Sequence, residues 1–200
     1  MIKKKINKLR SQFIKYGIDG YVVPKNDEFF SEYPDKDRLK IISNFTGSAG
    51  YAVILKNRNY LFVDGRYTIQ SRIESGKDFK ILEYSKIINS SVFKNLNLGI
   101  DPLLFTSKQV RNFFLKNNKI TVIKENLVDK ISKIPNKKKP SFYSIDKSIA
   151  GESHHKKVSR VSSFLKRNKY DYLFITAPEN VAWLLNIRGY DSPTSPIPNS

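Results

Sequence analysis

"ISNFTGSAGYAVILKNRNYLFVDGRYTIQ", residues Ile42 to Gln70, holds the clearest signals for the fold. It contains two runs of β-branched and aromatic residues, Tyr51 to Lys56 and Tyr60 to Val63. The turn residues Asn57-Arg58-Asn59 separate the two runs. This spacing predicts a β-hairpin, because Asn is a common turn residue that tolerates positive φ.

Small residues precede the hairpin, and a capping signal follows it. Gly47-Ser48-Ala49-Gly50 lacks the Lys-Ser/Thr pair of a phosphate-binding loop and leads into a strand where such a loop leads into a helix. We interpret it as a tight turn in which small residues let two backbone segments approach. After the hairpin, Asp64 predicts the N-cap of a helix from Gly65 to about Ser75, ended by Gly76.

The chain around this stretch alternates between helical and strand patterns. Apolar residues at helical spacing, Ile14 among them, predict a helix from Ile2 to Tyr16 that ends at Gly17. The other predicted elements are a strand at Gly20 to Pro24, a helix at Asp35 to Asn44 with Asp35 as its cap, strands at Phe79 to Tyr84, Leu98 to Asp101 and Ile120 to Lys124, and a helix at Thr106 to Lys116.

Prolines and lysines without apolar periodicity fill the segment from Ile134 to Pro140, which is the clearest break in the pattern. After this break, Ser153 predicts the N-cap of a helix. Tyr170 to Ile175 then predicts a strand, and Pro178 predicts the start of another helix. The order of elements in the first half thus begins again.

Two pairs of short segments match between the halves. KYGIDGYVVP at Lys15 to Pro24 parallels RNKYDYLFITAP at Arg167 to Pro178, and ISNFTG at Ile42 to Gly47 parallels LLNIRG at Leu184 to Gly189. This repetition predicts two domains of related fold. We expect a first domain at residues 1–134, a linker at residues 135–150 and a second domain at residues 151–200. We expect the second domain to be incomplete and the chain to be a fragment, because one predicted strand cannot form a sheet alone.

The chain has 200 residues, a formal net charge of +18 and no cysteine. The lack of cysteine excludes disulfides and thiolate metal sites and favours a reducing compartment. The charged start has no apolar segment after it, and no apolar run is long enough to span a bilayer. Positive charge attracts nucleic acid, but the lysines are scattered and no nucleic-acid-binding motif occurs. We expect a soluble cytoplasmic protein that binds neither nucleic acid nor a membrane.

Histidine-dependent chemistry has little support in this sequence. His154 and His155 are the only histidines. Neighbouring residues on a helix point about 100° apart, so these two cannot hold one ion together. The acidic residues, including Asp64, Asp101 and Asp129, show no paired spacing on one face. A Ser-His-Asp triad or a dinuclear metal site built from this chain alone is therefore excluded.

Arg66 lies in the first turn of the helix that Asp64 caps. A cation there lies near the positive end of the helix dipole, which is unfavourable by about 0.3–1 kcal/mol at an exposed position. Two interpretations stay open. Arg66 pairs only with Asp64 or a neighbouring carboxylate, or its guanidinium projects from the domain and binds a carboxylate or carbonyl of another molecule.

Together these motifs resemble those of a known family. The segments that carry the resemblance are GYVVP, SEY, ISNFTGSAGYAVI and YLFVDGRYTIQ, followed by GIDP at Gly99 to Pro102, KENLVDKI at Lys124 to Ile131 and NVAWLLNIRGYD at Asn180 to Asp191. They are similar to the N-terminal region of the Xaa-Pro aminopeptidases, within the creatinase/prolidase family. The resemblance covers almost the whole chain.

The resemblance implies an α/β fold with a mixed sheet flanked by helices, the ribonuclease H-like architecture of creatinase N-terminal domains. In the larger members of the family, two such domains precede a C-terminal pita-bread domain that holds two divalent metal ions, usually manganese. The family's metal ligands lie in that catalytic domain, which we expect this chain to lack. We therefore expect no metal and no other cofactor in this segment.

The function implied is that of a non-catalytic head of a metallopeptidase that removes an N-terminal residue preceding proline. The head would help to form the entrance for the peptide and a homodimer. By the resemblance, Arg66 matches an arginine that contributes to peptide binding, and Arg188 is a weaker candidate at the same entrance. The competing hypothesis is a stand-alone, non-enzymatic binding module of the same fold.

Overall fold

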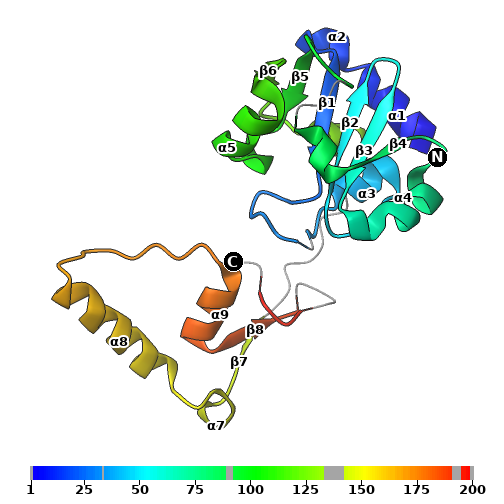
Figure 1. Ribbon diagram of the computed structural model, residues 1–200. Helices are drawn as coiled ribbons and strands as arrows, with labels where there is room; N and C mark the ends of the chain where they lie inside the picture. Colours follow the sequence, from blue (N-terminus) through cyan, green and yellow to red (C-terminus); the bar gives the residue numbers. More distant parts are fainter. Residues whose placement is uncertain (1, 33, 89–91, 133–141, 191–194, 199–200) are drawn as a thin grey trace. The chain divides into compact units, whose positions relative to one another are not determined.

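The structure is a computed structural model that describes residues 2–32, 34–88, 92–132, 142–190 and 195–198. The chain divides into two compact units, Met1–Ile134 and Pro135–Ser200. Each unit has its own β-sheet (Figure 1).

The first unit is built on a six-stranded sheet in the order β4-β3-β2-β1-β5-β6. Its strands are β1 (Gly20–Pro24), β2 (Gly50–Leu55), β3 (Asn59–Val63), β4 (Lys80–Glu83), β5 (Asn97–Ile100) and β6 (Lys119–Val122). Strand β2 runs opposite to the other five, because it pairs antiparallel with β1 and β3 while the remaining pairs are parallel. The predicted mixed sheet and the predicted β2–β3 hairpin are confirmed.

Helices cover both faces of this sheet (Figure 1). They are α1 (Ile2–Arg10), α2 (Phe13–Tyr16), α3 (Arg38–Ser43), α4 (Thr68–Ser75), α5 (Ser107–Val110) and α6 (Leu127–Ile131), with the short turns η1 (Gly65–Tyr67), η2 (Tyr84–Ile87), η3 (Pro102–Leu104) and η4 (Arg111–Leu115). One buried cluster joins α1, α3 and α6 to Tyr21 and Val23 of β1. A second cluster, on the opposite face, joins Val22 to the aromatic Phe93 and Phe114. Neighbouring residues of β1 thus serve two cores, as the two-residue period of a strand requires.

The caps explain where the helices of the first unit begin and end. Gly17 ends α2 with φ of 59°, which confirms its predicted role. The predicted helix from Ile2 to Tyr16 is interrupted after Arg10, and Ile14, one of the apolar residues on which the prediction rested, is 90% exposed. The cap of α3 is Asp37 rather than Asp35, because the Asp37 side chain accepts a hydrogen bond from the Lys40 backbone N–H.

The second unit contains β7 (Phe142–Ser144) and β8 (Ile187–Gly189), paired antiparallel, with α7 (Lys147–Ala150), α8 (His154–Arg167) and α9 (Pro178–Leu185). Ser153 caps α8 as predicted, with its side chain accepting from the Lys156 N–H. Within the predicted linker of residues 135–150, residues 135–141 lie outside the described residues, and the remainder holds β7 and α7.

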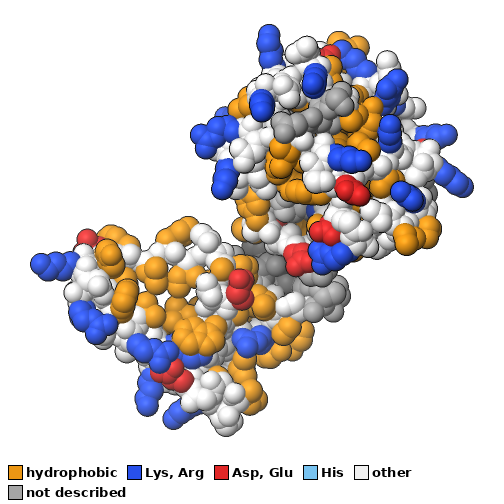
Figure 2. Space-filling view, in the orientation of Figure 1, with side chains coloured by type: hydrophobic (Ala, Val, Ile, Leu, Met, Phe, Trp, Pro, Cys, Tyr) orange, Lys and Arg blue, Asp and Glu red, His pale blue; other side chains and the backbone are white. Residues whose placement is uncertain are grey.

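The strand predicted at Tyr170 to Ile175 is wrong. Among the described residues this segment has no strand partner, and its side chains are exposed, Tyr172 by 92% and Phe174 by 88%. A strand forms only when another strand accepts its backbone hydrogen bonds, which a local apolar pattern cannot supply. Hydrophobic side chains accordingly cover much of the visible face of this unit (Figure 2).

In each unit a helix ends at an asparagine with the same backbone conformation, and the two asparagines occupy matching positions of the sequence repeat. Asn44 follows α3 with φ of 68°, and Asn186 follows α9 with φ of 53°. Both are left-handed caps, a conformation that non-glycine residues other than Asn and Asp rarely adopt. The repeat between ISNFTG and LLNIRG thus corresponds to a shared backbone geometry.

We predict that Gly50→Ala destabilises the protein by about 1–3 kcal/mol, the usual cost of overpacking a core. A Cβ at Gly50 would lie 2.9 Å from the Phe62 carbonyl oxygen, at the end of the β2–β3 pairing where Gly50 lies opposite Val63. Gly65→Ala is the matched control, because its Cβ would meet no atom within 4 Å. Urea denaturation of the 200-residue protein measures the free energy of unfolding of the two variants. Equal stability of the two variants would contradict the close approach.

Candidate functional site

The candidate site lies at the edge of the first sheet where β1, β3, β4 and β5 all end. These strands are mutually parallel, so the residues that follow them meet at one edge, together with the start of β2. Ligands of open α/β sheets commonly bind outside the carboxyl ends of the strands. We call this region the carboxyl edge. It carries the segment after β1, the turn before β2 and the Asp64-Gly65-Arg66-Tyr67 motif after β3.

The turn before β2 and the Arg66 motif are fastened to each other. The Ser48 and Tyr67 hydroxyl oxygens lie 2.9 Å apart, within hydrogen-bond distance. The Tyr67 ring packs edge-on against Phe45, with ring centroids 5.7 Å apart. A Cβ at Gly47 would lie 2.3 Å from the Phe45 ring, so the small residue there is needed for packing. The interpretation of this turn as scaffold agrees with that geometry.

Arg66 lies on the surface, in the short turn η1 that leads into α4. Its Nε donates to Asp64 Oδ1 at 2.9 Å, and its backbone N–H donates to the same oxygen at 3.0 Å. The guanidinium carbon lies 5.4 Å from the Tyr67 ring centroid. Its side chain is nevertheless 70% exposed. The N-cap role predicted for Asp64 is confirmed.

The pKa values of this pair move in opposite directions. The hydrogen bond from the Arg66 side chain, followed by that from its backbone N–H, lowers the pKa of Asp64. The same side-chain bond raises the pKa of Arg66, to which the charge of Glu32 also contributes. Glu32 belongs to the segment after β1, so the charge of a carboxylate in that segment acts on the guanidinium. Pairing with Asp64 is thus present, while the terminal nitrogens of Arg66 make no hydrogen bond within the described residues. Its role in peptide binding stays a prediction.

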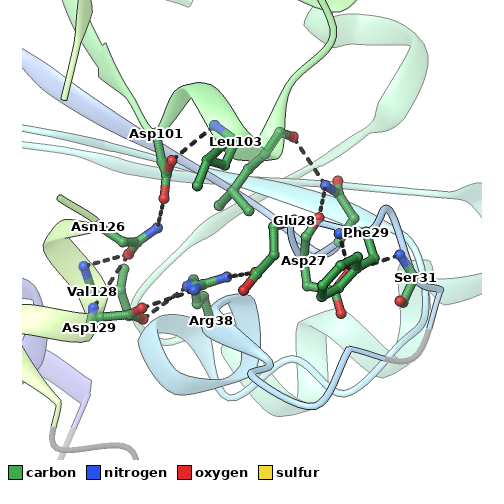
Figure 3. Close-up of polar contacts among 12 residues, drawn as sticks. Asp27, Glu28, Phe29, Ser31, Arg38, Asp101, Leu103, Asn126, Val128 and Asp129 are labelled. Carbon is green, nitrogen blue, oxygen red and sulfur yellow. Dashed lines mark hydrogen bonds and ion pairs between the residues drawn. The ribbon is translucent and has the colours of Figure 1, made fainter. Parts of the chain in front are cut away.

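The segment after β1 folds around the buried carboxylate of Asp27. Asp27 Oδ1 accepts hydrogen bonds from the backbone N–H groups of Phe29 and Ser31, both at 3.0 Å (Figure 3). Phe30 takes a left-handed conformation with φ of 59°, which is strained for an aromatic residue. Phe29 and Phe30 are 62% and 45% exposed. The segment therefore holds two aromatic rings at the surface on a fixed backbone.

A shallow pocket of about 170 Å³ lies between these segments. Its lining includes Lys25, Phe30, Ser48, Tyr51 and Tyr84. Lys25 is held there by Asp37, with 2.5 Å between Nζ and Oδ2. The pocket combines aromatic rings with an ammonium group and a hydroxyl, the composition of a small-molecule or peptide subsite.

An ion-pair network centred on the buried Arg38 supports the carboxyl edge (Figure 3). The Arg38 side chain, 5% exposed, donates to both oxygens of Asp129 at 2.9 Å and to Glu28 at 3.2 Å. Burial alone would lower the pKa of Arg38, but the hydrogen bonds to Asp129 and Glu28 raise it above its ordinary value. Beside this network, Asn126 donates to the buried Asp101 at 2.9 Å. The sequence alone does not identify Arg38 as a supporting residue, because its partner Asp129 lies 91 positions away along the chain.

Arg188, the weaker candidate, lies in β8 of the second unit. Its Nη1 donates to the neighbouring Ile187 carbonyl at 2.8 Å. A more buried cation lies nearby, since Lys157 donates to the Trp183 carbonyl and to Asn186 Oδ1 at 2.8 and 2.7 Å. Its Nζ also lies 4.2 Å from the Trp183 ring centroid. Lys157 thus fixes the end of α9 to α8, which is a structural role.

The described ranges lack both a metal-binding cluster and a helix able to span a bilayer. They contain no group of three or more His, Cys, Asp or Glu side chains able to hold a metal ion. His154 and His155 stack on each other with ring centroids 4.0 Å apart. None of the helices in these ranges combines the length and apolar character that a bilayer crossing requires.

We predict that Arg66→Ala raises the pKa of Asp64 towards its ordinary value, because the largest cause of the shift is removed. The pKa should stay somewhat depressed, since the backbone N–H of residue 66 still donates. A depressed carboxyl pKa stabilises the fold above the unfolded-state pKa, and this stabilisation is lost as the pH falls through the folded-state value. An NMR titration of the Asp64 carboxyl carbon measures the shift. An unchanged Asp64 pKa would show that the ion pair is absent in solution.

We predict that Asp129→Asn destabilises the protein by about 3 kcal/mol, since it leaves the buried Arg38 with one carboxylate partner. The control is Lys56→Ala, which removes a pair with Asp19 in which the Lys56 side chain is 59% exposed. That change should cost no more than about 1 kcal/mol. Urea denaturation compares the two, and an equal loss in both would contradict the supporting role of the network.

Comparisons with known proteins agree with these observations. A family model described as Creatinase/Prolidase N-terminal domain matches residues 5–129, and a second model with the same description matches residues 133–200. Among curated relatives, the probable Xaa-Pro aminopeptidase P of Laccaria bicolor is 32% identical over 97% of this chain and 33% of its own length. Xaa-Pro aminopeptidase 1 of Dictyostelium discoideum is 31% identical over 98% of this chain and 35% of its own length.

A solved structure of an aminopeptidase also matches nearly the whole chain. The X-prolyl aminopeptidase of Caenorhabditis elegans, described as a cytosolic enzyme with a di-nuclear active site, matches with a TM-score of 0.82 and 28% identity. The match covers 98% of this chain and 36% of that protein. This chain therefore spans about a third of the length of the relatives it matches. By its sequence and its fold, the chain belongs to the creatinase/prolidase N-terminal domain family.

Proposed function

We propose that this chain is the non-catalytic head of an Xaa-Pro aminopeptidase, a hydrolase that removes an N-terminal residue preceding proline. The similarity to Xaa-Pro aminopeptidases over nearly the whole chain is the observation that carries the proposal. The peptide would reach the catalytic centre past the carboxyl edge of the first unit. Arg66 would bind a carbonyl or carboxylate of the peptide there, and Arg188 is a secondary candidate for the same entrance.

The geometry of Arg66 supports this role. Its Nε is held by Asp64, so the orientation of the guanidinium is constrained before any ligand binds. The remaining nitrogens face solvent on a side chain that is 70% exposed. A guanidinium presents its donors as a planar fork that matches carboxylate geometry, and such charge-assisted bonds are among the strong ones.

The described residues do not fit a dinuclear metal centre, because they contain no group of three or more candidate ligands. The metals of the proposed enzyme, two divalent ions and by family resemblance manganese, would therefore be held elsewhere in the complete protein. We propose that residues 151–200 belong to a second domain of similar fold that this segment does not complete. The exposed Tyr172 and Phe174 support this proposal, since their counterpart strand β1 is buried throughout.

We further propose that the complete protein is a cytoplasmic homodimer. The description of the C. elegans enzyme as cytosolic supports the location. Exposed apolar side chains on α4 support an interface, since Ile69 and Ile73 lie four positions apart and are 73% and 80% exposed. Residues at this spacing share one face of a helix.

The first test is an activity assay of the 200-residue chain by itself. With manganese added, we expect no hydrolysis of an Xaa-Pro peptide, because the described residues provide no metal site. The complete protein under the same conditions should hydrolyse it. Metal-dependent turnover by the isolated chain would contradict the role of a non-catalytic head. An inactive complete protein that binds Xaa-Pro peptides would favour the stand-alone binding module.

The second test addresses Arg66 in the complete enzyme. Arg66→Ala should lower kcat/KM on short Xaa-Pro peptides by about tenfold or more, the effect of a lost charge-assisted bond of about 1.5–3 kcal/mol. Arg66→Lys should recover only part of this loss, because an ammonium lacks the planar fork. Arg72→Ala is the matched control, an exposed arginine on α4, the helix that follows η1. Normal kinetics with a large loss of stability would show that Arg66 serves only as an ion-pair partner.

A further inference from the structure

A second pocket lies at the opposite end of the first sheet from the carboxyl edge. It has a volume of about 470 Å³ and is lined by Arg10 at the end of α1, the β2–β3 turn, Tyr60, Asp78 and Lys80 at the start of β4. The lining is mostly polar or charged. Three of its side chains are cations and one is a carboxylate. None of the features assigned to peptide binding lies in this pocket.

Arg10 is the fixed cation of the pocket. Its Nε donates to the Leu55 carbonyl and its Nη2 donates to Asn59 Oδ1, both at 2.8 Å. Asn59 is held in turn, because its Nδ2 donates to the Asp78 carbonyl at 2.8 Å. Both partners of Arg10 are neutral, and no carboxylate forms an ion pair with it among the described residues. Burial without a counter-charge lowers the pKa of Arg10.

The other two cations of the pocket are free. Arg58, in the hairpin turn, and Lys80 are exposed. Across the described part of the chain, neither side chain makes a hydrogen bond or an ion pair. This contrasts with Lys25, Arg38 and Lys56 of the same unit, each of which has a carboxylate partner. The pocket therefore holds positive charge that the protein does not neutralise.

We propose that this pocket binds a phosphate group of a small anionic ligand. The cations of the lining exceed its carboxylates by two, which matches the charge of about −1.5 to −2 that a phosphate monoester carries at neutral pH. A monovalent carboxylate would leave part of this charge unbalanced. Arg10 supplies an oriented guanidinium, the group best suited to phosphate oxygens, and Arg58 and Lys80 can turn towards the ligand from the rim. This phosphate site is independent of the proposed peptide entrance, because the pocket lies at the other end of the sheet.

Inorganic phosphate is the probe for this site. The 200-residue protein is titrated with phosphate, with sodium chloride at matched ionic strength as the reference, while NMR follows the side-chain N–H signals of Arg10 and Arg58. The test variant is the double substitution Arg58→Ala and Lys80→Ala, since both residues are exposed and make no bond that folding requires. Arg10→Ala is avoided, because Arg10 holds the hairpin. Arg72→Ala with Lys119→Ala is the control, with the same loss of charge at exposed positions.

We expect phosphate, but not chloride, to shift the Arg10 and Arg58 signals. The double variant should bind phosphate about tenfold more weakly or worse, a change of about 1.4 kcal/mol, while the control pair binds as the unmodified protein does. Equal weakening in both pairs would mean that net charge alone attracts the anion and would overturn the proposal. A short DNA duplex of mixed sequence forms the second arm of the test. A response to the duplex without any response to phosphate would also overturn it, in favour of a nucleic-acid backbone.

Discussion

The carboxyl edge depends on the ion pairs made by the buried guanidinium of Arg38. A charge removed from water must be paired, or the fold loses several kcal/mol. Arg38 is paired on two sides, by Asp129 of α6 and by Glu28 of the segment after β1. The last helix of the first unit is thus tied to α3 and to the segment that carries Phe29 and Phe30. The sheet brings these parts to one edge, and the ion pairs fix how they meet there.

This support changes what the exposed residues of the edge can do. A surface segment of polar and aromatic residues would ordinarily sample many conformations, and binding would have to order it. Here Asp27 fastens the segment after β1 through backbone hydrogen bonds, and Ser48 fastens the Arg66 motif through Tyr67. The charge of Glu32 contributes, after the bond to Asp64, to the raised pKa of Arg66. Any ligand that binds at this edge would therefore cost little conformational entropy.

The features predicted well from the sequence are those whose cause is local. The caps at Gly17, Asp64 and Ser153 and the hairpin around Asn57 each depend on a few neighbouring residues, and all are present. The error in the second unit has a cause distant in the chain. Tyr170 to Ile175 has the composition of a strand but lacks a partner in the described residues, and no local pattern reveals that. The pairing of Arg38 with Asp129 depends on the topology of the sheet, as does the meeting of Arg10 with the hairpin turn. Arg66 stands out in the sequence because a cation in the first turn of a helix breaks a local rule, and its role in binding stays a prediction.

Arg66 contributes little to the stability of the fold, and its side chain is therefore free to serve in binding. The unfavourable field at the start of the helix is offset locally by Asp64, which both caps the turn and pairs with Nε. The guanidinium therefore needs no buried partner, and nothing in the core depends on it. Arg38 differs from Arg66 in both respects. Its side chain is buried and its charge is paired with Glu28 and Asp129, so a ligand cannot reach it. An arginine that the fold neither buries nor requires, held in one orientation at the edge where five parallel strands end, is suited to contact a molecule outside the domain.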